Sequence, residues 1–176
     1  MADRRRHDQH DPQHPTEQQL VPYLKERIYV TFIGLAVLLA LGGHGAETDP
    51  LTAVSSLVIA AVGAGLAGLI SEIVAHLAVK GNLPDAAEMR FLVGVSAGAL
   101  ATVILPVVIL LLALVGWIDT QLALDIAVWV MAITLGAIGY MAVFRASLPW
   151  WTKLAVFGGL LLFGLVVVGV QLLAHG

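Results

Sequence analysis

The chain contains no cysteine among its 176 residues. Disulfide bonds, thiolate zinc sites, iron–sulfur clusters and cysteine nucleophiles are therefore excluded. Charged residues are also scarce, at 12% of the chain, and the formal net charge is only −3. Because the sequence has no basic stripe of the kind that binds a phosphate backbone, nucleic acid is not an expected partner.

Apolar residues, in contrast, make up most of the sequence. They account for 59% of the chain, and the mean hydropathy is +0.92, whereas roughly half of a soluble domain is apolar. The C-terminal segment 154–174 is apolar on every side, although a soluble helix would need a polar face. We therefore expect an integral membrane protein. No nucleophile–base pair or cofactor motif is visible, so we expect neither an enzyme nor a resident cofactor.

Five apolar segments are long enough to cross a hydrocarbon core of about 30 Å, which takes about 20 helical residues. The predicted fold is an all-α, polytopic membrane protein whose five-helix transmembrane domain covers residues 27–176. Residues 1–26 form an N-terminal tail that we expect to be disordered or interfacial, because its Asp, His, Gln and Pro content cannot bury a core. The predicted helices span residues 28–46, 51–79, 89–116, 121–144 and 151–174.

The basic residues predict the orientation of the helices. Counting the crossings puts every lysine and arginine on one side of the membrane, while the opposite side carries Glu47, Asp49 and Asp119. By the positive-inside rule, the N-terminus is cytoplasmic and the C-terminus lies outside. The basic residues are Arg4, Arg5, Arg6, Lys25, Arg27, Lys80, Arg90, Arg145 and Lys153.

Small residues indicate where the helices approach one another. Lipid tails are as apolar as leucine, so membrane helices associate through close backbone contact at small side chains. Gly68 lies on such a face of the second helix, and Gly94 with Gly98 forms a GxxxG motif on the third. We expect the second and third helices to pack together. We also expect a homodimer through helices that include the first or second, and whether Gly94 and Gly98 serve it stays open.

A proline interrupts the third predicted helix. Pro106 has no N–H to donate to the carbonyl of Thr102, so a kink is expected there. The freed carbonyl, next to the Thr102 hydroxyl, could contact a passing ion, or neighbouring groups could satisfy it.

Two ionisable residues lie near the end of the second helix. Glu72 and His76 are four residues apart, so they share one face of the helix and a single metal ion or proton could interact with both. The alternative is that they only mark where the helix leaves the lipid, since about 20 residues from Leu51 reach Ser71. On the fourth helix, Asp125 is either an outer station on an ion path or a carboxylate favoured by the helix dipole.

The third helix contains the string VSAGALATVILPVVILLLALVG, in which Ser96 and Gly98 precede Pro106. Together with a glycine-rich second helix carrying Glu72, it resembles the vacuolar iron transporter family over roughly residues 27–175. The resemblance implies a dimer that moves Fe²⁺, and often Mn²⁺, out of the cytosol in exchange for protons, with a path lined by the first two helices. The chain has only KGNLPDAAEMR where the better-studied branch has a cytoplasmic metal-binding insert.

The sequence thus favours a proton-linked divalent metal transporter in a bacterial inner or plasma membrane. Its partners would be the lipid bilayer and a divalent ion, with Glu72 as the central ligand or proton acceptor and His76 as its partner. The alternative is a structural or accessory membrane protein with a transporter-like fold. The scarcity of polar groups in the first and fifth helices favours that alternative.

Overall fold

The computed structural model describes residues 17–43, 48–145, 149–155 and 158–159. Within these ranges the chain forms helices and no strand, as predicted. The named elements are α1 (Glu17–Gly42), α2 (Pro50–Lys80), α3 (Ala86–Leu100), the 3₁₀ turn η2 (Ala101–Val103), α4 (Ile104–Leu114) and α5 (Thr120–Arg145).

Three helical stretches within the described residues are long and apolar enough to cross a membrane. They are Pro50–Lys80, Ala86–Leu114 and Thr120–Val143, and the second of them runs from α3 through η2 into α4. These stretches agree with the second, third and fourth predicted spans and are those of a multi-pass membrane protein. The five-helix count and the orientation stay predictions, and most of the predicted helix 151–174 lies outside the described residues.

The first helix begins earlier than its apolar segment suggests. It starts at Glu17 rather than near residue 28, so the predicted N-terminal tail is helical from Glu17 on. Two causes explain the difference. The added residues include Glu, Gln, Leu, Lys and Arg, all good helix formers, and Tyr23 and Glu26 pack against neighbouring helices.

Local signals set the ends of the helices that flank the α2–α3 connection. The side chain of Asp49 accepts a hydrogen bond from the Thr52 N–H and caps the N-terminus of α2. The helix ends at Gly81, whose φ of 72° lies in the left-handed region that favours glycine. Asp85 then begins α3 with a capping box formed with Glu88.

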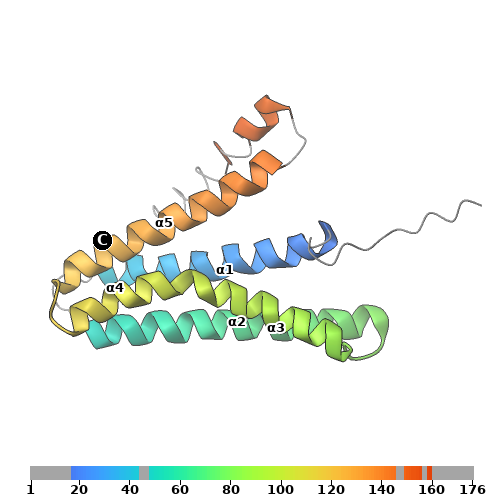
Figure 1. Cartoon of the computed structure of the whole chain (residues 1–176), viewed down its shortest axis with the longest axis horizontal. Coiled ribbons are helices and arrows are strands. Elements are labelled where there is room, and N and C mark those ends of the chain that lie inside the picture. Colours follow the sequence, from blue (N-terminus) through green and yellow to red (C-terminus); the bar gives the residue numbers. More distant parts are fainter. Residues whose placement is uncertain (1–16, 44–47, 146–148, 156–157, 160–176) are drawn as a thin grey trace, which may run out of the picture.

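The third predicted helix is interrupted just before Pro106. Residues Ala101–Val103 form a tighter 3₁₀ turn between α3 and α4, and Pro106 lies buried in the following turn. The ribbon changes direction at this point (Figure 1). The Thr102 hydroxyl donates a 2.7 Å hydrogen bond to the carbonyl of Ala99.

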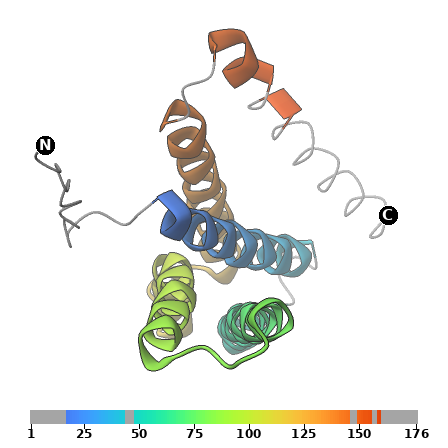
Figure 2. The same cartoon turned by 90° about the vertical axis from the view of Figure 1, so that its right-hand side faces the viewer.

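The first helix is the centre of the bundle. It contacts α2, α3 and α5, and in the end-on view it runs between α5 and the α2–α3 pair (Figure 2). Gly34 permits this close approach, because a Cβ there would meet Met131 of α5 and lie 3.3 Å from Leu57 of α2. The largest fully buried side chains are Leu38, Leu57, Leu110, Leu124, Met131, Val30, Thr31 and Pro106.

The outer face of α2, in contrast, is apolar and exposed. Ile59, Ile70 and Val74 are each more than half exposed, although α2 is one of the candidate membrane spans. A soluble monomer rarely exposes a continuous apolar face of this kind, so the surface fits contact with lipid or with another apolar helix.

Candidate functional site

A buried carboxylate lies between α1 and α2. Glu26 of α1 is only 4% exposed, and its side chain lies against Gly68 of α2. A Cβ at Gly68 would overlap with the Glu26 carboxyl group, so glycine is the residue that leaves room for the acid. No hydrogen-bond partner of Glu26 Oε1 is found among the described residues. Such a group is costly to bury as an anion, which makes it a functional candidate.

The electrostatics of Glu26 reflect this position. Burial raises the pKa of Glu26 above its ordinary value, and the nearby charge of Glu72 raises it further. The ammonium of Lys25 acts in the opposite direction. Desolvation is the largest of the three effects, so the protonated form of Glu26 is favoured more than it would be in water.

Glu72 belongs to the same cluster. It lies one helical turn after Gly68 on α2, and therefore on the same face as the glycine that contacts Glu26. Its Oε1 accepts a hydrogen bond from the Lys25 ammonium of α1. The Glu72 side chain is 32% exposed and that of Lys25 is 57% exposed, so this ion pair is at the rim of the interface. We call Lys25, Glu26, Gly68 and Glu72 the Glu26 cluster.

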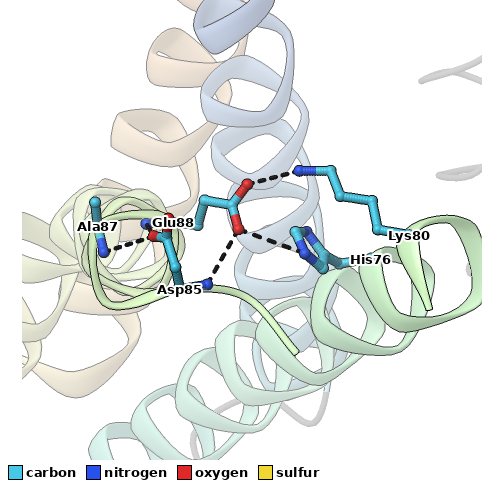
Figure 3. A network of polar contacts seen from close by, with 5 residues as sticks. All are labelled: His76, Lys80, Asp85, Ala87 and Glu88. Carbon is cyan, nitrogen blue, oxygen red and sulfur yellow. Dashed lines mark hydrogen bonds and ion pairs between the residues drawn. The ribbon is translucent and has the colours of Figure 1, made fainter. Parts of the chain in front are cut away.

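His76 contacts a different helix from Glu72. Its Nε2 lies 3.4 Å from Glu88 Oε2 at the start of α3, and its side chain is 13% exposed. Glu88 also accepts hydrogen bonds from the Lys80 ammonium at 2.6 Å and from the Asp85 N–H at 3.1 Å (Figure 3). These four side chains form the connection network, which ties the end of α2 to α3.

Asp85 anchors the connection network to the α3 backbone. Its Oδ1 accepts hydrogen bonds from the Glu88 and Ala87 N–H groups, each at 2.8 Å (Figure 3). These two backbone donors, Glu88 first, hold the pKa of Asp85 below its ordinary value. The connection network thus consists of the N-cap of α3 and a histidine of α2 that contacts it. Its role is to hold the end of α2 against the start of α3.

A second glycine contact lies on the α3 side of α1. The Arg27 guanidinium donates to the Tyr23 hydroxyl and lies over the Tyr23 ring, with 4.3 Å between its central carbon and the ring centroid. The ring packs on Gly98, where a Cβ would come within 2.9 Å of Cε2. Gly98 therefore serves the contact of α3 with α1, while a Cβ on Gly94 would meet nothing within 4 Å.

The other predicted site residues lie away from the Glu26 cluster. Asp125 is exposed near the start of α5, and its Oδ1 accepts a 3.2 Å hydrogen bond from Gln121. The start of α5 lies at the end of the bundle opposite the α2–α3 connection (Figure 1). Ser96 is buried on α3, and Thr102 and Pro106 belong to the interruption of the third helix. The structure thus pairs Glu72 with Lys25 of α1 and directs His76, one turn further along α2, at Glu88 of α3.

Sequence reasoning missed Glu26, because the run Lys25–Arg27 reads as the charged flank of a membrane segment. A usable signal was present. Glu26 precedes Val30, Gly34 and Leu38 at successive four-residue steps, and all four are buried. An acidic residue at the same four-residue spacing as the buried residues lies on the buried face of the helix, where it contacts other helices.

No three His, Asp or Glu side chains converge into a metal-binding group within the described part of the chain. Comparisons of the chain with models of protein families, with curated proteins and with solved structures find no match. Function is therefore inferred from the side chains of the Glu26 cluster and from the membrane character of the helices.

Proposed function

We propose that this chain is an integral membrane protein that moves a divalent cation, Fe²⁺ or Mn²⁺, in exchange for protons. Glu26 and Glu72 are the carboxylates that hold the cation at the cytoplasmic end of its path. The observation that carries the proposal is the buried Glu26 carboxyl group, which lies against Gly68 and near the charge of Glu72. One of its oxygens has no hydrogen-bond partner among the described residues.

The chemistry of two carboxylates suits this cargo. Carboxylate and water oxygens are the ligands that Mn²⁺ favours. A transported ion keeps part of its water shell, so two protein carboxylates from two helices suffice for a transient site. Both acids bind a metal only when they are deprotonated, so proton uptake releases the ion. Burial already favours the protonated form of Glu26, so this carboxyl group can take up a proton as the ion leaves.

Glu72 keeps its predicted place as the central ligand, but its partner in this proposal is Glu26 instead of His76. The reason is that His76 is directed at Glu88 in the connection network. A part for His76 in metal binding, and for Asp125 as an outer station, stays a prediction.

Orientation and assembly complete the proposal. All nine basic residues fall on one side of a five-helix arrangement, which supports a cytoplasmic N-terminus and an external C-terminus. The resemblance to vacuolar iron transporters supports Fe²⁺ and Mn²⁺ as the ions. The exposed apolar face of α2 is available for the proposed homodimer.

The test is Mn²⁺ flux into liposomes that contain the purified full chain and carry a pH gradient. The wild type should move Mn²⁺, and Glu26→Gln and Glu72→Gln should each reduce the rate to about a tenth or less, since even partners of metal ligands contribute about 10–100-fold. Asp119→Asn is the matched control, because asparagine also caps a helix and Asp119 caps α5 far from the cluster. Flux that is unchanged in Glu72→Gln would contradict the proposal.

A structural or accessory membrane protein remains the second candidate. Two observations favour it: Glu72 already has a partner in Lys25, and the described residues contain no three-ligand group. Under this alternative the liposomes take up no Mn²⁺, and Mn²⁺ does not raise the thermal midpoint of the protein, because a ligand stabilises the native state only if it binds there.

A further inference from the structure

We propose that Lys25 is a tethered competitor of the transported cation. Its ammonium pairs with the Glu72 carboxylate when no metal ion is bound, and this ion pair must open before a metal ion can bind there. This inference rests on the proposed function, because it assigns a regulator to the same site.

The geometry of α1 gives Lys25 this position. Lys25 directly precedes the buried Glu26, and its side chain reaches across to α2 to donate to Glu72 Oε1. The same ammonium also lowers the pKa of Glu26, so its charge acts on both carboxylates of the cluster. A divalent ion at these carboxylates would meet a positive charge at short range, and the two cations repel each other.

The ion pair is also weak enough to open. More than half of the Lys25 side chain and about a third of the Glu72 side chain are exposed, so water competes for both partners. Exposed ion pairs of this kind contribute little net free energy. Lysine carries its charge on a flexible four-carbon chain, so the ammonium can swing into water without moving α1. In both states the Glu72 charge has a partner, which is either Lys25 or the metal ion.

A second ion pair in the same protein provides a matched control. Lys80 pairs with Glu88 at 2.6 Å, and their side chains are 53% and 39% exposed, close to the values for Lys25 and Glu72. Lys80 lies in the connection network and not in the Glu26 cluster. Removing its charge therefore changes the overall charge by the same amount without freeing Glu72.

The experiment measures Mn²⁺ binding to the full chain in detergent by isothermal titration calorimetry. Lys25→Gln should lower the apparent Kd for Mn²⁺ by roughly two- to fivefold, the equivalent of a weak exposed ion pair. Lys25→Arg should stay close to the wild type, because a guanidinium pairs with Glu72 as well. Lys80→Gln should leave the Kd unchanged, and Glu72→Gln should weaken binding strongly.

The outcomes separate the two proposals. If the wild type binds Mn²⁺ and Lys25→Gln binds it equally or more weakly, the competitor role is overturned and the proposed function stands. The same holds if Lys80→Gln tightens binding as much as Lys25→Gln, because general electrostatics would then explain the effect. If neither the wild type nor any variant binds Mn²⁺, both proposals fall.

Discussion

Replacing Gly68 by alanine tests the contact on which the candidate site depends. The added Cβ would lie 2.9 Å from Glu26 Oε2 and closer still to the rest of the carboxyl group. Since such distances are too short for a real Cβ, the Glu26 carboxyl group must swing aside or α1 must move away from α2. Forcing an extra carbon into a packed interface typically costs about 1–3 kcal/mol. The atoms that the Cβ would meet are the end of a flexible side chain, so the cost of this contact lies at the low end of that range, about 1 kcal/mol.

Gly63 on the same helix provides the control. A Cβ there would meet nothing within 4 Å, so Gly63→Ala gains helix propensity without a clash. Gly68→Ala gains the same propensity, and the difference between the two variants isolates the contact with Glu26. In a chain of this length, 1 kcal/mol shifts the thermal midpoint by about 2–4 °C, so Gly68→Ala should melt roughly 2–4 °C below Gly63→Ala.

The assay is thermal unfolding of the detergent-solubilised protein, repeated in a Glu26→Ala background. Truncating Glu26 removes the group that the new Cβ would meet, so the two alanine variants should then melt together. This is a double-mutant cycle, and its coupling free energy reports the Gly68–Glu26 contact alone. Equal midpoints in the wild-type background, or a difference that survives Glu26→Ala, would show that Gly68 does not accommodate the acid.

Two further predictions concern pH. Burial raises the folded-state pKa of Glu26 above its ordinary 4.5, so its contribution to stability is fully present below about pH 4.5 and is lost as the pH rises through the raised pKa. Glu26→Gln cannot ionise, and its thermal midpoint should therefore rise relative to the wild type with increasing pH; parallel curves would contradict this. At the start of α3, backbone donors lower the pKa of Asp85 from 3.8, so the cap stabilises the protein above that pH and is lost as the pH falls through the lowered pKa. Asp85→Ala should reduce the midpoint near neutral pH, whereas Asp85→Asn should retain most of it, because asparagine also caps helices; equal losses in the two variants would show that the side-chain cap is unimportant.

Composition and local patterns determined the helices. Long apolar segments predict the spans that α2 and α5 occupy, because a helix in lipid must satisfy every backbone group within itself. The proline between Thr102 and the end of the third segment predicts the interruption that η2 forms. Asp49 and Gly81, at the two ends of α2, act through the backbone groups closest to them. Such signals are local, so they can be read without knowledge of the neighbouring helices.

The start of α1 was less predictable. The apolar run begins at Ile28, but the helix begins at Glu17. The hydropathy of a sequence predicts the part of a helix that lies in lipid. It does not predict a polar extension of the helix that packs against other helices. The burial of Glu26 depends on this packing, since its carboxyl group lies against Gly68 of α2.

The spacing of Glu72 and His76 fixed their positions on α2, and the tertiary structure decided their partners. Four residues along a helix put both side chains on one face, but that face borders α1 at Glu72 and the start of α3 at His76. Helical periodicity determines on which face of its own helix a side chain lies. The neighbouring helix that a side chain meets depends on the packing of the whole bundle. In this protein that packing pairs Glu72 with Lys25 of α1 and places His76 against Glu88 of α3.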